Sequence, residues 1–247
     1  MNITRRWKRL VAFGCTHGVN IDPVAKAAIL KMIQGYKPHT IVNGGDFLDT
    51  TAFRSGAKGT ADESEPVEPD LKEGIEFLHE ARCTHVLGGN HEDRLWRLQS
   101  SPNAIVSFCA SQAITRIHEA CRKLKAPFHP WGGAFQEPFI FGGTKFIHGY
   151  MYNENAARDH AESHGNVVHW HTHRPAIATG RRDDHPVGIC PGSMTRRRNM
   201  DYAKARRQTL AWGQAILWGE YCDSAAAFNL CLGPSEQAEA SKWILPV

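Results

Sequence analysis

The sequence predicts an α/β fold built around parallel strands. Two apolar, β-branched segments, Leu10-Val11-Ala12-Phe13 and Thr40-Ile41-Val42, each end at a glycine and are separated by one helical pattern. The same order recurs once more and ends in Thr84-His85-Val86-Leu87. Strands that alternate with helices are joined by crossover connections and lie parallel in one sheet. We therefore expect an α/β protein, and a single domain over residues 1–247.

The composition is that of an ordinary globular protein, with 42% hydrophobic and 22% charged residues and a formal net charge of +4. No apolar run approaches the roughly 20 residues that cross a bilayer. The apolar segment after the basic start ends at Gly14, too soon for a secretory signal. We expect a cytoplasmic protein without membrane insertion. The seven cysteines form no Cys-x-x-Cys pair, so reduced thiols are expected instead of disulfides.

Capping residues mark the first two helices. Asp22 and Pro23 begin a helix that Gly35 ends, and Asp70 is expected to cap a second helix with an apolar stripe at Leu71, Ile75 and Leu78. Residues 50–66 are polar and aperiodic, which predicts a long surface loop. This loop either flanks a functional site or is inert.

The pattern changes after a long helix predicted over residues 103–125. Phe139-Ile140-Phe141 and Lys145-Phe146-Ile147 flank Gly142-Gly143, as the strands of a hairpin do. The remaining expected elements are a short helix over 154–163 and strands near 177 and over 187–190, 212–218 and 226–232. The second half is therefore expected to be rich in strands.

Residue types that bind metals recur where predicted strands end. In chain order they are Cys15-x-His17, Gly45-Asp46-x-x-Asp49, Gly89-Asn90-His91-Glu92, His148 and His171-x-His173. In open α/β sheets, ligands bind at the carboxyl ends of the strands. Neutral imidazole is the commonest protein metal ligand near pH 7. The pattern therefore predicts a metal centre at this edge.

This series resembles the signature of the calcineurin-like metallophosphoesterases, which reads Asp-x-His, Gly-Asp-x-x-Asp, Gly-Asn-His-Asp or Glu, a lone His, and Gly-His-x-His. The resemblance runs from residue 11 to about residue 195. It implies a four-layer αββα sandwich of two mixed β-sheets flanked by helices. It also implies hydrolysis of phosphate esters, in which two divalent ions activate water for attack on phosphorus.

The resemblance also implies the metal ligands. His17, Asp46 and His173, with Cys15, would hold the first ion, and Asp46, Asn90, His148 and His171 would hold the second. Asp46 would bridge the two ions. Mixed imidazole and oxygen ligands suit Mn, Fe, Zn or Ni better than Ca or Mg.

Three further residues have catalytic or supporting roles by the same resemblance. His91 would stabilise or protonate the leaving oxygen, with Glu92 or Asp93 as the carboxylate that orients it. Asp49 would fix the orientation of a metal ligand. The alternative for His91 is a structural imidazole beside the site.

The sequence departs from the family pattern at two positions. Cys15 stands where the family has Asp, and either binds an ion as thiolate, favouring Zn or Fe, or only fills space. Trp170 stands where the family has Gly, and it creates a rival His-x-His at His169 and His171. We prefer His171 and His173, because Arg174-Pro175 matches the usual continuation of the family motif.

A basic segment follows the last motif and favours phosphodiester or nucleic-acid substrates. It contains Arg196, Arg197 and Arg198, then Lys204, Arg206 and Arg207, and Trp170, Tyr202 and Trp212 are candidates for stacking on bases. Arg196, Arg197 and Trp170 are thus the expected substrate-binding residues. Alternatively, the segment is only a solvated surface.

Other functions remain open at this point. They are a small-molecule phosphatase, a cyclic-nucleotide phosphodiesterase and a catalytically silent scaffold of the same fold. Retention of His91 weighs against the scaffold, since binding alone does not need it.

Overall fold

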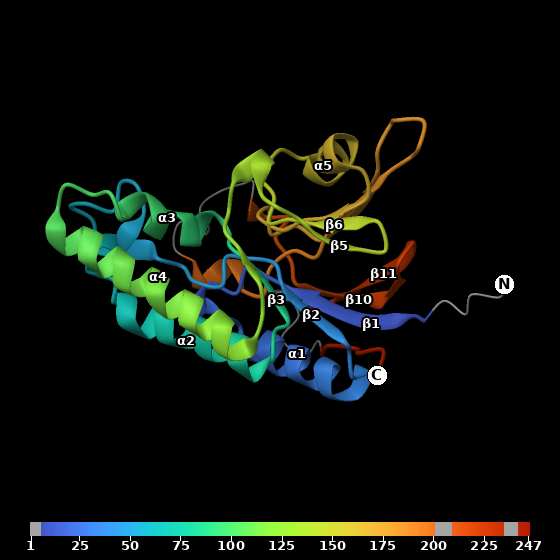
Figure 1. Ribbon diagram of the computed structural model, residues 1–247, viewed down its shortest axis with the longest axis horizontal. Helices are drawn as coiled ribbons and strands as arrows, with labels where there is room; N and C mark the ends of the chain where they lie inside the picture. The colour runs from blue at the N-terminus through green and yellow to red at the C-terminus, as the bar shows by residue number, and fades with distance from the viewer. Residues whose placement is uncertain (1–5, 201–208, 235–241) are drawn as a thin grey trace.

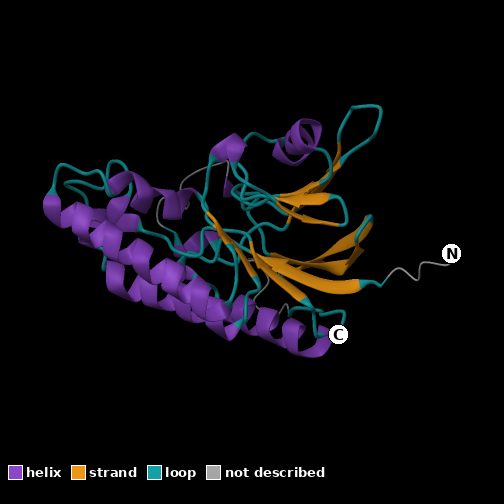
Figure 2. Ribbon diagram, viewed as in Figure 1, coloured by secondary structure: helices purple, strands orange, loops and turns teal. Residues whose placement is uncertain are grey.

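The computed structural model describes residues 6–200, 209–234 and 242–247, and these form two facing β-sheets with helices outside both (Figures 1 and 2). Helices α1, α2 and α4 lie against the outer face of the larger sheet, and α5 lies outside the smaller one (Figure 1). The helices are α1 (Pro23–Tyr36), α2 (Val67–Glu80), α3 (Asn90–Leu98), α4 (Ala104–Leu124) and α5 (Ala156–His164). This is the mixed α/β sandwich that the resemblance implies.

The larger sheet has the strand order β11-β10-β1-β2-β3-β4. Its strands are β1 (Lys8–Phe13), β2 (Thr40–Asn43), β3 (His85–Leu87), β4 (Phe128–His129), β10 (Ala215–Cys222) and β11 (Ala225–Leu232). Strands β1 to β4 are parallel, as predicted for the first three, and β10 and β11 add an antiparallel edge. The carboxyl ends of β1, β2 and β3 therefore meet at one edge of the sheet.

The smaller sheet has the order β5-β6-β7-β9-β8. Its strands are β5 (Phe139–Phe141), β6 (Thr144–Phe146), β7 (Val167–Val168), β8 (Ala176–Thr179) and β9 (Val187–Cys190). The predicted hairpin is β5-β6, and both glycines of its turn have positive φ, which explains the Gly142-Gly143 pair. The chain leaves β6 into His148 and leaves β7 into the segment 169–173.

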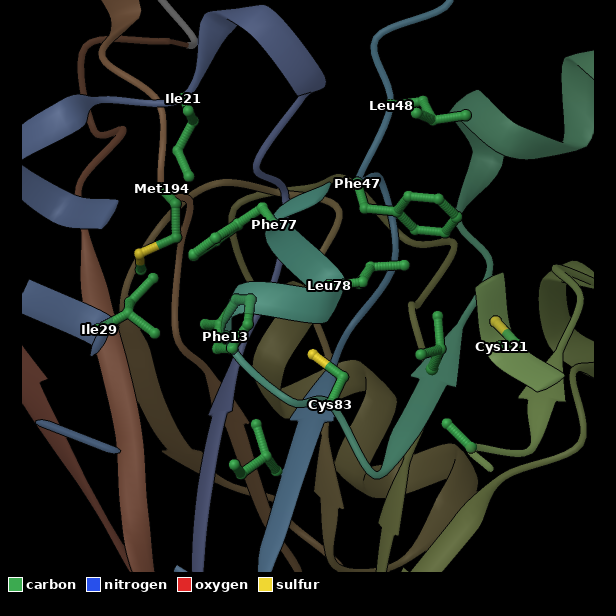
Figure 3. Close-up of a cluster of buried hydrophobic side chains, with 14 of the residues drawn as sticks. Phe13, Ile21, Ile29, Phe47, Leu48, Phe77, Leu78, Cys83, Cys121 and Met194 are labelled. Atoms are coloured by element: carbon green, nitrogen blue, oxygen red, sulfur yellow. The ribbon is translucent and has the colours of Figure 1, made fainter. Parts of the chain in front are cut away.

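Strand β1 separates two hydrophobic cores. Val11 and Phe13 pack in the core beneath the helices, with Ile29, Phe77 and Leu78 (Figure 3). The alternate residues Leu10 and Ala12 pack in the core between the sheets, with Val42, Leu87, Phe146 and Trp170. Because successive side chains of a strand point to opposite faces, a strand covered on both sides is apolar throughout.

Two helices near the candidate ligands differ from the expectation. Helix α2 begins at Val67, and the carboxylate of Asp70 accepts hydrogen bonds from the backbone amides of Asp49 (3.0 Å) and Thr50 (2.9 Å). Asp70 therefore holds a loop and is not an N-cap. Helix α3 was not expected, because its polar start lacks apolar periodicity. The sequence feature that marks the start of α3 is Glu92 at the third helical position, because its carboxylate accepts a hydrogen bond from Gly89 N.

Asp22 caps α1 as expected, and Asn103 caps α4. All seven cysteines are free. Within the described ranges, the structure contains no helix long and apolar enough to cross a membrane.

Candidate metal centre

The candidate ligands lie on tight turns after the strands, and several have a left-handed backbone. Positive φ values are found at Cys15 (51°), His17 (52°), Asp46 (50°), His171 (68°) and His173 (58°). Residues other than glycine seldom adopt this conformation, and such residues cluster at functional sites. Backbone hydrogen bonds join the first two turns, since Cys15 N donates to Gly45 O (2.8 Å) and His17 N to Asp46 O (2.9 Å).

The first group of donors comprises Cys15, His17, Asp46 and His173, all buried, with their donor atoms within 4.8 Å of one another. His17 Nδ1 lies 2.9 Å from Asp49 Oδ1, so that nitrogen donates to the carboxylate and Nε2 faces the group. Nε2 of His17 lies 3.1 Å from Nε2 of His173. Two imidazole lone pairs at this distance repel unless a proton or a cation lies between them.

The second group comprises Asp46, His148 and His171, and the amide of Asn90 joins them. His148 Nδ1 donates to Gly44 O (2.8 Å), which leaves Nε2 facing Asp46 Oδ2 and Asn90 Oδ1, each at 3.2 Å. His171 Nδ1 lies 2.7 Å from the same Asn90 oxygen. Here too, acceptors converge on a position suited to a cation.

The protonation states suit metal binding. Burial would raise the pKa of Asp46, but the charges of His148, His91 and His17 outweigh it and hold that pKa well below its usual range. Burial lowers the pKa of His171 to about 4 and that of His173 well below its usual value, so both imidazoles are neutral near pH 7. The Asp46 carboxylate and the neutral imidazoles of His171 and His173 are donors that suit transition-metal ions.

His91 lies beside both groups and is oriented by Asp49. Its Nδ1 donates to the backbone carbonyl of Asp49 (2.8 Å) and lies 3.2 Å from the Asp49 carboxylate. Its Nε2 is 3.9 Å from Asp46 Oδ2. Asp49 therefore contacts both His17 and His91 and joins a candidate ligand to the candidate proton donor.

Glu92 and Asp93 do not orient His91, which corrects that expectation. The buried Glu92 carboxylate accepts hydrogen bonds from the amides of Gly89 (2.7 Å), Leu48 (2.8 Å) and Asp46 (2.9 Å). Burial raises the pKa of Glu92 to about 7. Asp93 pairs instead with Arg97 one helical turn later. Glu92 holds the backbone of the Asp46 turn in place.

Trp170 does not stack on a substrate, which is a second correction. Its side chain is 0% exposed and packs between the sheets, against Gly14 and Gly44. A Cβ atom at Gly44 would lie 2.1 Å from the indole, so only glycine fits there. His169 is also buried, and its ring stacks on His160 at 4.1 Å. The structure brings His171 and His173, not His169, to the donor groups.

The basic segment is partly engaged within the fold. Nε of Arg196 donates to the buried carboxylate of Asp22 (2.6 Å), which also accepts from Gln214 (3.0 Å). Arg196 is therefore tied to the start of α1, and its role in substrate binding stays a prediction. Arg197 is half-buried and Arg198 is exposed. The expectations for Tyr202, Lys204, Arg206 and Arg207 lie outside the described residues.

Two residues near the centre escaped the sequence analysis because no motif includes them. Gln136 accepts a hydrogen bond from His148 N (2.7 Å) and donates to Gly88 O (2.8 Å). Arg94 donates to the backbone carbonyl of Asp49 (2.8 Å). The loop 50–66 flanks the site, since its residues line a cavity of about 120 Å³ with Asp49 and Asp70.

Three solved structures are similar to this chain over most of its length. A metallophosphoesterase from Sphaerobacter thermophilus is 14% identical, with a TM-score of 0.45, and the match covers 91% of this chain and 88% of that one. The phosphoesterase Yfce from E. coli is 14% identical, with a TM-score of 0.41 and coverage of 90% and 98%. Vps29 from Entamoeba histolytica is 11% identical, with a TM-score of 0.40 and coverage of 92% and 99%. No curated protein matches the sequence.

The family model for calcineurin-like phosphoesterases matches residues 8–215, a range that contains every candidate ligand. The chain therefore belongs to the calcineurin-like phosphoesterase family, which implies metal-dependent hydrolysis of phosphate esters.

Proposed function

We propose that the chain hydrolyses phosphodiesters with two divalent ions held on either side of Asp46. The observation that carries this proposal is the convergence of buried imidazole, carboxylate and amide donors on one carboxylate, with His91 beside them. Cys15, His17 and His173 would complete the first ion site, and Asn90, His148 and His171 the second. Two such ions would supply Lewis acidity toward the phosphoryl oxygens and lower the pKa of a water nucleophile.

The identity of the ions follows from the donor atoms. Imidazole and carboxylate donors suit Mn, Fe, Zn and Ni, and a thiolate at Cys15 shifts the first site toward Zn or Fe. Burial, followed by the charge of Asp46, raises the pKa of the Cys15 thiol in the metal-free chain. Coordination of Cys15 would therefore require a cation to displace the thiol proton.

Protonation of the leaving oxygen is the step that we assign to His91. Because Nδ1 donates to Asp49, Nε2 is the nitrogen that faces the centre, and in the imidazolium form of His91 it would give its proton to the leaving oxygen. The Asp49 carboxylate beside Nδ1 would stabilise the imidazolium form. A scaffold that only binds has no use for this pair, so the pair supports catalysis.

The preference for diesters rests on the basic segment beside the first ion site. Ser193 Oγ and Met194 N both donate to the carbonyl of Cys15, each at 3.1 Å. The exposed Arg198 thus lies four residues after the segment that contacts Cys15. At this position it would attract a polyanion such as a nucleic acid. A small-molecule phosphatase, a cyclic-nucleotide phosphodiesterase and a silent scaffold are the alternatives.

The experiment is hydrolysis of bis(4-nitrophenyl) phosphate and 4-nitrophenyl phosphate, with metal analysis of the same preparation. We expect faster turnover of the diester and loss of activity when a chelator removes the ions. Faster turnover of the monoester would favour the phosphatase. Bound ions without hydrolysis of either ester would favour the scaffold.

A further inference from the structure

The loop of residues 130–136 borders the second ion site and carries Trp131. The indole Nε1 of Trp131 donates to Gly149 O (3.0 Å), and Gly149 directly follows His148. The backbone of Trp131 lies close to Gly88, where a Cβ atom would be 3.1 Å from Trp131 N. Gly88 precedes Asn90 by two residues. Trp131 is therefore anchored to the immediate neighbours of two candidate ligands.

Trp131 has a cationic neighbour, and two exposed aromatic residues lie in its own loop and in the loop after His148. The guanidinium of Arg97 lies 5.9 Å from the ring, within cation–π range, and is held by Asp93. Phe135 in the same loop is 95% exposed, and Tyr152, after His148, is 78% exposed. By contrast, the cavity on the Asp49 side of the centre is lined by the acidic residues Asp49, Asp62, Glu65 and Asp70. A negatively charged ester with a planar group is complementary to the Trp131 side.

The anchoring of Trp131 fixes its ring, which remains partly exposed. The indole nitrogen is satisfied by Gly149, so the ring needs no other polar partner, and its orientation is fixed before any ligand binds. The side chain is half-buried, unlike the enclosed Trp170. A fixed aromatic ring near a cation is the arrangement on which nucleobases stack in proteins that bind single-stranded nucleic acids.

We propose that Trp131, supported by Arg97, stacks on the base of a nucleoside phosphoester whose phosphate lies at the ion centre. The position of the phosphate rests on the proposed function. The position of the base rests on the contacts of Trp131 alone. The substrate class is then a nucleotide ester or an oligonucleotide end, and the aromatic contact expected at Trp170 is made by Trp131.

The test is equilibrium binding of AMP and of ribose 5-phosphate to the manganese-loaded protein. These ligands differ only in the base, so the ratio of their dissociation constants isolates base recognition. We expect AMP to bind about 5- to 150-fold more tightly, the range of one stacked base. Trp131→Ala should bring the ratio close to one without changing the affinity for ribose 5-phosphate. Equal binding of the two ligands by the wild-type protein would overturn the proposal.

Two further variants separate stacking from structural support. Trp131→Phe keeps an aromatic ring but loses the hydrogen bond to Gly149, so most of the preference for AMP should remain. A Phe variant that behaves like Trp131→Ala would show that Trp131 only supports the His148 loop, which contradicts the proposal. Trp7→Ala is the control, because Trp7 is 42% exposed just before the amino-terminal end of β1, and its ratio should stay at the wild-type value.

Failure of this proposal is distinguishable from failure of the proposed function, because binding requires no turnover. If the protein hydrolyses neither aryl ester but binds AMP preferentially through Trp131, the stacking site is supported and the assigned reaction is wrong. A protein that hydrolyses the diester but binds both ligands equally would retain the reaction and lose the stacking site.

Discussion

The two halves of the candidate centre share Asp46 but differ in burial and in donor chemistry. Cys15, His17 and His173 in the first half are all buried, and one of them carries a thiol. In the second half His148 is buried, but Asn90 and His171 are half-exposed. A closed site with a soft donor favours a thiophilic, slowly exchanging ion, whereas an open site with amide and imidazole donors leaves room for substrate.

The halves also differ in what holds them. The first half is held by the Asp49 carboxylate on His17 and by the 193–194 segment on Cys15 O. The second half is held by Gly44 O on the His148 ring and by Gln136 on the His148 backbone. Groups that orient metal ligands commonly change affinity by about 10- to 100-fold when removed. We therefore expect that each half can be weakened separately, and among the described residues Asp46 is the one that belongs to both donor groups.

Replacement of Asp46 by asparagine should have the largest effect. The amide keeps the size but loses the charge that faces the imidazoles of both halves, so we expect both ions to be lost. Diester hydrolysis should fall by about 10³-fold or more, as when a major electrostatic contact is removed. Metal-to-protein ratios and turnover, measured together, check this outcome. Near-normal occupancy of both sites would contradict the bridging assignment.

Replacement of His91 by alanine should reduce turnover without removing either ion. Loss of a proton donor costs about 10²- to 10⁴-fold, and the loss should be smallest for leaving groups that need no proton. Rates for a 4-nitrophenyl diester and an alkyl diester, measured beside metal content, test this. Equal losses on both esters would indicate that His91 only supports the Asp49 turn.

The succession of strands and helices along the first half of the chain and most of the candidate ligands could be predicted, because they depend on local signals. Alternating strand and helix patterns predicted the parallel sheet, and Asp46, His148 and His171 each follow a recognisable strand. Their convergence follows from parallel topology, which brings the carboxyl ends of strands to one edge. The family match confirms the fold that these patterns indicated.

The failures concern contacts between segments far apart in the sequence. Trp170 was expected to face a substrate, but two glycines on other strand ends, Gly14 and Gly44, leave room for its ring in the core. Glu92 was expected to orient His91, but the distant amides of Asp46 and Leu48 bind its carboxylate. Gln136 lies in no motif. Its role depends on its contacts with Gly88, just after β3, and with His148, just after β6. Such partners are set by tertiary packing.

Replacement of Cys15 tests the first half alone. If Cys15 coordinates an ion, Cys15→Ser should weaken only the first site, because serine is a poor anion. Cys15→Asp should restore two ions and favour Mn, and aspartate also tolerates the positive φ at this position. Cys83→Ser is the control, since Cys83 is a buried thiol in the helix-side core. Unchanged stoichiometry in Cys15→Ser would show that Cys15 only fills space.

Replacement of Gln136 or Arg196, which hold candidate ligands in place without binding an ion, should have the smallest effects. Each replacement should lower the metal affinity of one half of the centre only. Gln136→Ala removes the acceptor for His148 N and the donor to Gly88 O, so we expect about tenfold weaker binding at the second site alone. Arg196→Met leaves Asp22 without its charged partner and loosens the segment that contacts Cys15 O, so we expect a similar change at the first site alone. Titration of metal-free protein with Zn and with Mn resolves the two affinities. If either variant weakens both sites equally, the halves act as one unit, and the contrast between a closed first site and an open second site does not extend to metal affinity.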